Sequence, residues 1–347
     1  MKFYTKTHQY YCGIDLHTKT QYLCVLDQTG EILLHKNFPT KPKTFINAVK
    51  PFREDLIVGV ECMFSWYWLA DLCAREKIAF ILGHALYMKA IHGGKAKSDK
   101  IDSEKIARLI KGGTFPLAYT YPPELRPTRD LLRRRRMLVR HRSEVLAHIK
   151  LTHYQYNAQF FEKNINKKGN RQHVAELFDD PAIIKNINVD LSVADHLHDE
   201  IKFLENYIVR HVKKFDPRTY YRLQTVPGIG KILALTMLYE IGRIERFDTV
   251  QSFCPYCRLV KCSKESAGKL YGYGGQKIGN AHLKWAFSEA TALFMRESQQ
   301  AKNYVARLSN KHGKGKAMSI LAHKLGRAVY CVIKRKDAFD VNYFFSN

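Results

Sequence analysis

The sequence predicts three kinds of structure in succession: a mixed-sheet α/β region, a long helical middle, and a mostly helical C-terminal region. Residues 9–112 alternate short apolar strands with helical patterns, which favours a mixed sheet covered by helices. Residues 125–213 are helical in pattern and highly charged. Further on, Val226-Pro-Gly-Ile-Gly-Lys231 leads into an apolar helix, a pattern similar to a helix–hairpin–helix DNA-binding element.

The N-terminal region carries the clearest strand signals. Thr29-Gly30 lies between two apolar runs and predicts a tight hairpin turn. The run Leu56–Glu61 is almost continuously apolar, as expected of a strand buried on both faces. We expect strands at residues 9–15, 20–27, 31–38, 56–61 and 78–82, and helices after Pro42 and at 65–76, 84–92 and 99–112.

Glycine and proline pairs divide the chain. Gly112-Gly113 and Pro122-Pro123 end the first region, and Pro217 opens the last one. The middle predicts a basic helical or coiled-coil segment, broken near 165–171. Residues 263–280 are rich in Gly and Lys and predict a loop or hairpin, with helices expected at 281–299 and about 315–335. The expected domains are 1–122, 123–215 and 216–347.

The charge balance indicates a polyanionic partner. Fifty-seven Lys and Arg stand against 32 Asp and Glu, a formal net charge of +25. Nucleic acid is favoured over a membrane surface, because no isolated amphipathic basic helix stands out. No apolar run is long enough to span a bilayer, and the N-terminus lacks the pattern of a signal peptide. We therefore expect a cytoplasmic protein without a membrane partner.

The eight cysteines are scattered, which argues against a disulfide framework. Cys254-Pro-Tyr-Cys257 is similar to a glutaredoxin redox motif, but it does not follow a strand in a small βαβ unit. Together with Cys262 it offers three zinc ligands, and no fourth ligand has suitable spacing. Redox and zinc roles remain minor alternatives.

Four carboxylates suggest a metal site. Asp15 and Glu61 each end an apolar strand, and Asp99 and Asp102 lie three residues apart at the start of a helix. Such carboxylates repel one another unless a divalent cation neutralises them, and oxygen ligands suit Mg²⁺, with Mn²⁺ as the second choice. In the plainer interpretation, Asp15 ends a strand at a turn and Glu61 pairs with a surface lysine. Asp99 is then the N-cap of its helix, and Asp102 interacts favourably with the helix dipole.

Two groups of residues are candidates for nucleic-acid contacts. The first is a run of arginines on the basic helix, which either contacts phosphates or is simply solvated. The second belongs to the turn at 226–231 and to the Gly- and Lys-rich loop at 263–280, where lysines could stabilise charge on phosphoryl oxygens. The candidates are Arg126, Arg129, Arg133, Arg134, Arg135, Arg136, Arg140, Gly228, Gly230, Lys231, Lys264 and Lys269.

The order of these motifs resembles a known family. Gly-Ile-Asp15, Val-Gly-Val-Glu61 and Lys-Ser-Asp99-Lys-Ile-Asp102 look like the DEDD motif of the bridge-RNA-guided insertion-sequence transposases, relatives of the Piv-type invertases. The resemblance continues through Val226-Pro-Gly-Ile-Gly230 and on past Gly279-Asn280. It implies a RuvC-like (RNase H-like) N-terminal fold whose four carboxylates bind Mg²⁺.

The resemblance also implies a serine nucleophile that forms a covalent phosphoserine with DNA. The matching residue is Ser266, with Ser263 as the runner-up. The sequence departs from the family at Cys257-Arg258, where a small residue and glycine are common, and at Glu265, where a serine is common. The resemblance further implies a structured non-coding guide RNA as partner and a homodimer or homotetramer.

Three hypotheses follow. The leading one is a DNA recombinase that uses Asp15, Glu61, Asp99, Asp102 and Ser266. The second is a metal-dependent, structure-specific endonuclease that uses the carboxylates and water without Ser266. The third is a nucleic-acid-binding protein without catalysis, in which the carboxylates are only structural.

Overall fold

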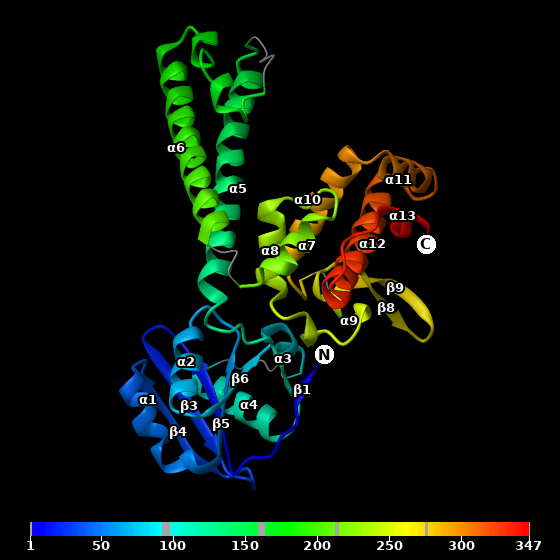
Figure 1. Cartoon of the computed structure of the whole chain (residues 1–347). Coiled ribbons are helices and arrows are strands. Elements are labelled where there is room, and N and C mark those ends of the chain that lie inside the picture. Colours follow the sequence, from blue (N-terminus) through cyan, green and yellow to red (C-terminus); the bar gives the residue numbers. More distant parts are fainter. Residues whose placement is uncertain (1, 92–97, 159–163, 212–214, 275–276, 347) are drawn as a thin grey trace. The chain divides into compact units, whose positions relative to one another are not determined.

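A computed structural model of the chain describes residues 2–91, 98–158, 164–211, 215–274 and 277–346. The chain forms two compact units, Met1–Pro123 and Glu124–Asn347, which are described separately below (Figure 1). The helical segment expected at 123–215 lies in the same unit as the C-terminal region.

The first unit is built on a five-stranded mixed sheet. Its order is β4-β3-β2-β5-β6, with antiparallel pairing among the first three strands and parallel pairing of β5 with β2 and of β6 with β5. The predicted strands are confirmed to within about two residues at each end. Their bounds are β2 Tyr10–Leu16, β3 Thr20–Leu26, β4 Ile32–Pro39, β5 Leu56–Glu61 and β6 Ala79–Gly83.

Helices cover both faces of this sheet, as the mixed-sheet expectation required. One face packs Cys12, Ile14 and Val58 against Phe45 and Leu69, and the other buries residues of α4. The helices are α1 Pro42–Val49, α2 Tyr67–Arg75, α3 Ala85–Ile91 and α4 Asp99–Lys111. A short 3-10 helix, η1 Lys50–Asp55, leads into β5, and β1 Phe3–Tyr4 pairs with β7 Phe115–Pro116. Residue 92, the expected end of the third helix, lies outside the described residues.

Close packing of α4 on the sheet depends on Gly13 in the central strand. A Cβ atom added at Gly13 would lie 2.3 Å from both the Ala107 nitrogen and the Ser103 oxygen of α4. Because real Cβ atoms do not approach backbone so closely, only glycine permits this contact. The contact brings the N-terminal half of α4 alongside β2, two residues before Asp15.

Two long helices open the second unit, α5 Arg126–Gln155 and α6 Pro181–His211. They lie side by side (Figure 1) and bury Leu146, Ile149 and Ile187 between them. The expected break is confirmed, since only the 3-10 turns η2 Lys168–Asn170 and η3 Ala175–Leu177 occupy the described part of the connection. Supercoiling of the pair stays a prediction.

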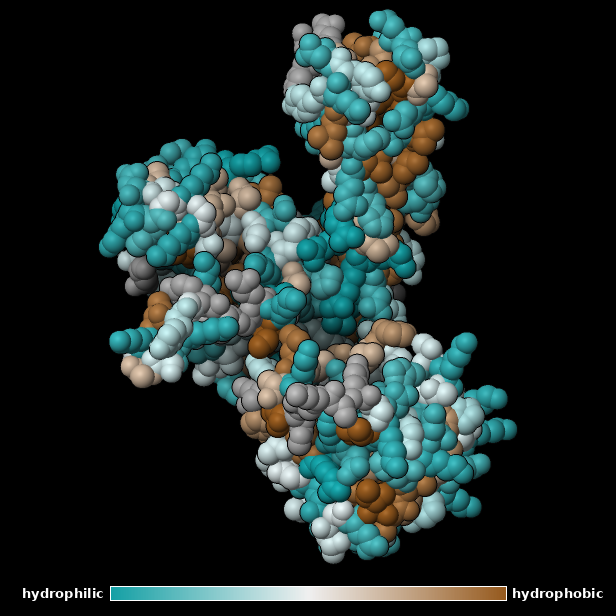
Figure 2. Space-filling model, turned by 180° about the vertical axis from the view of Figure 1, so that it is seen from behind, coloured by the Kyte–Doolittle hydropathy of each residue, from teal (hydrophilic) through white to brown (hydrophobic). Residues whose placement is uncertain are grey.

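Apolar side chains also remain on the outside of this helix pair (Figure 2). Leu151, Val189 and Phe203 are all exposed. Among the described residues, no helix combines the length and the apolar character that crossing a bilayer would need.

The rest of the second unit is a helical core with one hairpin. Helix α8 is buried all round except near its N-terminus, which explains why its sequence is apolar without a polar stripe. The helices are α7 Pro217–Gln224, α8 Lys231–Ile241, α9 Val250–Tyr256, α10 Ala281–Glu297, α11 Gln299–His312, α12 Lys314–Arg335 and α13 Val341–Ser346. The hairpin strands are β8 Cys262–Ser266 and β9 Lys269–Gly274, and η5 is Ile244–Arg246.

One predicted helix extends past the point where the observed helix ends. The sequence predicted a single helix over 281–299, but α10 ends at Glu297 and a second helix, α11, begins at Gln299. Ser298 ends the first helix in an extended conformation and caps the second, its hydroxyl accepting a hydrogen bond from the Ala301 nitrogen at 3.2 Å. Helices α9, α11 and α13 were not predicted.

Candidate active site

Two of the four predicted carboxylates lie on neighbouring strands of the first unit. Ile14 of β2 pairs with Val60 of β5 in parallel register. Asp15 and Glu61 are therefore each the next residue along, at the carboxyl ends of two adjacent strands, and both are half-buried. Parallel pairing places such residues at one edge of the sheet. That Glu61 shares a metal ion with Asp15 stays a prediction.

The other two carboxylates lie in the first turn of α4. Ser98, rather than Asp99, is the N-cap, because its hydroxyl accepts a hydrogen bond from the Ile101 nitrogen at 3.3 Å. The cap interpretation of Asp99 is thus wrong, and its carboxylate is left available for other contacts. Asp102 lies 3.6 Å from the Lys105 ammonium.

Asp15, Asp99 and a histidine that the sequence analysis overlooked form one cluster. The Nε2 atom of His17 lies 3.3 Å from Asp15 Oδ2 and 3.6 Å from Asp99 Oδ1. One ligand atom from each of the three residues lies within 4.8 Å of the other two. The signal that could have found His17 is its position two residues after Asp15, on the same side of an extended chain.

Electrostatics tie Asp102 to the same cluster. Burial raises the pKa of Asp15, the His17 imidazole lowers it, and the charges of Asp99 and Asp102 raise it further, with a net upward shift. Like charges close to a half-buried carboxylate are stabilised when a cation binds among them. The donor set therefore fits a divalent metal ion.

Ser266 lies at the tip of the exposed β8–β9 hairpin of the second unit. It pairs with Lys269 across a two-residue turn in which both Ala267 and Gly268 have positive φ, 48° and 73°. Lys269 is thus the direct cross-strand partner of Ser266, and Lys264 precedes Ser266 by two residues on β8, with a register irregularity between Lys264 and Glu265. All three are exposed.

Arg258 fixes the base of this hairpin. Its Nε donates to the Gly279 oxygen at 2.9 Å, and its terminal nitrogen donates to the Lys277 oxygen. Arg258 follows the end of α9 with φ of 55°, a conformation that suits glycine best. At this departure from the family pattern, the arginine side chain binds the residues that lead from the hairpin to α10.

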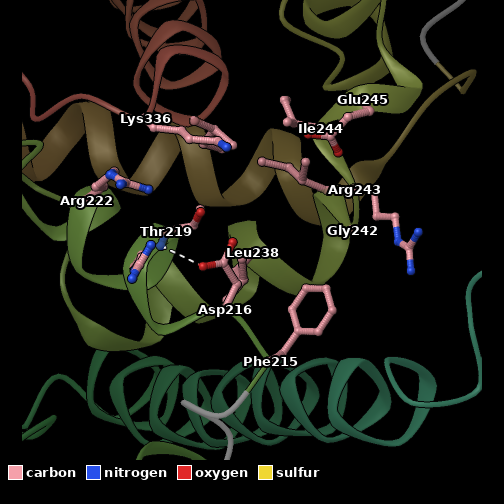
Figure 3. A pocket seen from close by; sticks show the side chains of 13 residues that line it. Phe215, Asp216, Thr219, Arg222, Leu238, Gly242, Arg243, Ile244, Glu245 and Lys336 are labelled. Carbon is pink, nitrogen blue, oxygen red and sulfur yellow. Dashed lines mark hydrogen bonds between the residues drawn. The ribbon is translucent and has the colours of Figure 1, made fainter.

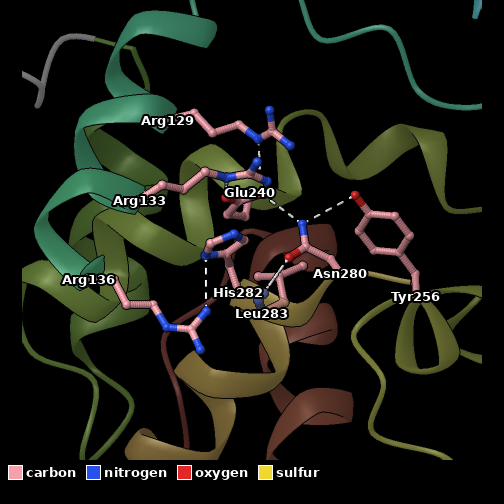
Figure 4. Close-up of polar contacts among 8 residues, drawn as sticks. All are labelled: Arg129, Arg133, Arg136, Glu240, Tyr256, Asn280, His282 and Leu283. Carbon is pink, nitrogen blue, oxygen red and sulfur yellow. Dashed lines mark hydrogen bonds and ion pairs between the residues drawn. The ribbon is translucent and has the colours of Figure 1, made fainter. Parts of the chain in front are cut away.

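A buried polar network centred on Glu240 connects α5, α8 and the start of α10 (Figure 4). Arg129 Nε donates to Glu240 Oε2 at 3.0 Å, and Arg133 binds both carboxylate oxygens. Asn280 donates to Glu240 at 2.7 Å while its own oxygen caps α10. Burial alone would raise the pKa of Glu240, but the hydrogen bond from Arg133 and the charge of Arg129 bring it down to about 2.

His282 and Arg136 extend the network (Figure 4). An Arg136 terminal nitrogen lies 3.1 Å from His282 Nδ1, and its guanidinium lies 5.0 Å from the centre of the Trp285 ring. Burial, followed by the charge of Arg133, lowers the pKa of His282 to about 4. The imidazole is therefore neutral near pH 7 and can accept the Arg136 hydrogen bond.

The structure separates the arginines that the sequence grouped together. Arg126 and Arg129 are buried, so a direct phosphate contact does not fit their placement. Arg133 and Arg135 are half-buried and bind Glu240 and Glu205 respectively. Of the seven arginines proposed on this helix, the exposed ones are Arg134 and Arg140. The sequence could not separate them, because their acidic partners lie far away along the chain.

The candidates in the turn at 226–231 also divide into a buried residue and exposed ones. Gly228 is buried, and a Cβ atom there would lie 2.4 Å from the Ala290 oxygen of α10, so its role is packing. Gly230 and Lys231 are exposed at the N-terminus of α8, where a phosphate contact stays a prediction.

Comparisons with known proteins place both units in one family. Residues 12–154 match a DEDD transposase domain of the IS110 type, and residues 220–306 match the Transposase IS116/IS110/IS902 family. The chain belongs to the IS116/IS110/IS902 transposases. Transposases cut and rejoin DNA, so the protein is an enzyme.

Two curated relatives cover nearly the whole chain. The transposase for insertion sequence element IS1111A from Coxiella burnetii is 19% identical over 94% of this chain and 90% of its own length. The transposase for insertion sequence element IS1328 from Yersinia enterocolitica is 23% identical over 94% of this chain and 97% of its own length. The DEDD match includes all four predicted carboxylates, and the second match includes Ser266.

In this transposase the redox alternative for Cys254 and Cys257 finds no support. Both thiols are buried in the core of the second unit, and burial raises the pKa of Cys254 to about 11 and that of Cys257 well above its ordinary value. A redox cysteine needs an accessible thiolate, and zinc binding needs deprotonated sulfur. The side chain of Cys262 lies outside the described residues.

The second unit also contains a pocket of about 260 Å³ beside α7 and α8 (Figure 3). Arg218, Arg222 and Lys336 line it together with Asp216 and Glu245. None of the predicted site residues lines this pocket. Asp216 is engaged there as the cap of α7, accepting from the Thr219 nitrogen at 2.9 Å.

Proposed function

We propose that this transposase cuts and rejoins DNA through a covalent phosphoserine at Ser266, with Asp15, Glu61, Asp99 and Asp102 holding Mg²⁺ or Mn²⁺. The carboxylate cluster carries the metal half of the proposal, because Asp15 and Asp99 are brought together from a strand and a helix far apart in sequence. The exposed Ser266, paired across the hairpin with Lys269 and two residues from Lys264, supports the covalent half.

The steps conserve bonds. The Ser266 hydroxyl attacks the scissile phosphorus. An O–P bond to serine forms, the bond to one DNA oxygen breaks, and that oxygen takes up the serine proton to become a hydroxyl. A DNA hydroxyl then attacks the phosphoserine, forms a new O–P bond and gives its proton to the released Ser266 oxygen. Lys264 and Lys269 stabilise the charge on the phosphoryl oxygens. The carboxylates would hold a divalent cation, which would supply Lewis-acid polarisation of the phosphate.

The RuvC-like character of the first unit belongs to the same proposal. An antiparallel three-stranded meander followed by two parallel strands agrees with it, as does the DEDD match. We also infer a structured non-coding RNA as guide, held through its backbone by exposed basic residues such as Arg134 and Arg140. A homodimer or homotetramer would supply the several active sites that exchange of DNA strands requires.

The test is a trapped protein–DNA adduct. We expect the purified chain, given Mg²⁺, DNA of its insertion element and the RNA, to form an adduct that survives denaturing electrophoresis. Mass spectrometry should place the phosphate on Ser266. Ser266→Ala should abolish the adduct, and Ser263→Ala, three residues away on the same strand, should leave it intact.

The outcomes separate the candidate functions. A Ser266→Ala variant that still cuts DNA would favour the metal-dependent endonuclease, which the DEDD domain also fits. If Asp15→Asn changes neither metal binding nor cutting, the carboxylates have no catalytic part and the proposal fails.

A further inference from the structure

His17 faces the carboxylate cluster, whereas the other histidines of the first unit that the structure describes have different surroundings. His8 binds Asp55 and Tyr4, and His35 binds the Lys100 oxygen. His84 packs against Tyr87 in a tilted arrangement, with ring centres 4.5 Å apart. His17 is therefore the imidazole whose nitrogen lies within 4 Å of two predicted metal ligands.

The backbone holds His17 in place independently of its side chain. It directly follows β2, in the short turn to β3, where its nitrogen donates to the Thr20 oxygen at 2.9 Å. Its own oxygen accepts from the Thr40 hydroxyl at 3.0 Å. The imidazole is thus presented from a fixed position, and its side chain remains 45% exposed.

The separations match those of neighbouring ligands around one ion. Six donors at about 2.1 Å from a small divalent cation place adjacent donors roughly 3 Å apart and opposite donors roughly 4.2 Å apart. The His17 nitrogen lies 3.3 and 3.6 Å from its two carboxylate oxygens. One ligand atom from each of the three residues lies within 4.8 Å of the other two, so side-chain adjustment would bring all three onto one cation.

We propose that His17 is a direct nitrogen ligand of the metal ion bound by Asp15 and Asp99, and that it shifts the preference of the site from Mg²⁺ toward Mn²⁺. This inference rests on the metal site proposed above. Mg²⁺ favours oxygen donors alone. Mn²⁺ is the weakest binder among the divalent first-row transition metals, but it accepts an imidazole nitrogen more readily than Mg²⁺ does. His17 therefore sets which cofactor the transposase uses best.

The direct test is pulsed EPR spectroscopy of Mn²⁺ bound to the full-length protein. A directly bonded imidazole gives a characteristic coupling to its nitrogen-14 nucleus. We expect that coupling in the wild-type protein and its loss in His17→Ala. His8→Ala, which removes an imidazole of the same unit that binds Asp55 rather than the cluster, should keep it.

Equilibrium binding gives a second readout. His17→Ala should weaken Mn²⁺ binding by on the order of 10-fold, because loss of even an outer-shell partner typically costs 10- to 100-fold in metal affinity. Mg²⁺ binding should change less, so the dissociation constant for Mg²⁺ divided by that for Mn²⁺ should fall. His17→Gln, which keeps a polar side chain but no imidazole, should also lack the nitrogen coupling.

Each result decides between the two proposals. Wild-type protein that binds no Mn²⁺, or Asp15→Asn protein that binds it unchanged, overturns the metal site itself. Mn²⁺ bound with Asp15 but without nitrogen coupling in the wild type leaves the metal site standing and overturns the role of His17. Because the wild-type spectrum is decisive, the inference remains testable even if a variant folds poorly.

Discussion

Glu240 shows what a single buried charge does in this fold. Its side chain is 1% exposed and sits among two arginines and an asparagine that come from two other helices. Desolvating a carboxylate is costly, and the cost is offset only when charged hydrogen bonds surround it. The network therefore ties α5 and the α10 N-terminus to α8, next to the segment that leads out of the Ser266 hairpin.

Replacing Glu240 should destabilise the second unit strongly. We expect Glu240→Gln to lower the free energy of unfolding by about 3–5 kcal/mol, because two arginines would lose their buried partner. Glu205→Gln removes the partner of Arg135 at a more exposed position and should cost about 1 kcal/mol or less. Urea denaturation monitored by circular dichroism measures both, and equal losses would contradict the argument.

The same residue gives a pH dependence with a defined sign. The pKa of Glu240 falls from 4.5 to about 2 on folding, so its stabilisation is complete above pH 4.5 and is lost as the pH falls toward 2. The wild type should lose about 3 kcal/mol more than Glu240→Gln across that window. If Glu240→Gln and the wild type lost the same stability between pH 4.5 and 2, Glu240 would not be held ionised in the folded protein.

At the scale of elements, the turn between α7 and α8 is first of all required for packing against α10. Gly228 has φ of 82°, and a Cβ atom there would meet the backbone of α10 at 2.4 and 2.5 Å. Gly230 has φ of −80° and open space around it. Two glycines that look alike in the sequence thus differ in role: Gly228 permits close packing, and Gly230 is an unconstrained helix cap.

Alanine substitutions at the two positions should therefore differ in their cost to the free energy of unfolding. Gly228→Ala should cost roughly 2–5 kcal/mol, from the left-handed backbone and from displacement of α10. Gly230→Ala should cost about 1 kcal/mol or less, as for an ordinary change at a helix cap. Thermal unfolding of both variants provides the measurement, and a tolerated Gly228→Ala would show that the turn is not packed on α10 as described.

Element positions in the first unit were predictable because their signals are local. The strand carrying Asp15 and the strand carrying Glu61 follow from short apolar runs, and the helix of Asp99 and Asp102 follows from its periodicity. The break between α10 and α11 was missed, since a serine that ends one helix and caps the next looks like an ordinary helical residue.

At the scale of the whole molecule, the proposed chemistry is divided between two units. All four carboxylates and His17 lie in Met1–Pro123, and Ser266 lies in Glu124–Asn347. Each unit has its own hydrophobic core: one formed by both faces of the sheet, the other by α8, α10 and α12 with their neighbours. A division of this kind makes metal binding and covalent chemistry experimentally separable.

A fragment of residues 1–123 should therefore fold and bind metal alone. We expect its Mn²⁺ affinity to lie within a few-fold of that of the full chain, because every proposed ligand is present. It should form no covalent adduct with DNA. Isothermal titration calorimetry and circular dichroism check this prediction, and an unfolded fragment would show that the second unit is needed to stabilise the first.

The sequence by itself determined the strands, the long helices and the four carboxylates at their ends, together with the family to which the chain belongs. These features depend on periodicity and on motifs of a few consecutive residues, which the linear order preserves. The charge excess also follows from composition, and it indicates a nucleic-acid partner without saying which residues make contact.

Only the tertiary structure decided which polar side chains meet. Glu240 lies 107 residues from Arg133 along the chain and yet neutralises it, which removes that arginine from the freely exposed set. His17 joins Asp99 only because α4 packs on β2. Charge pairing and metal coordination act across space over a few ångströms, and distance along the sequence carries no record of them.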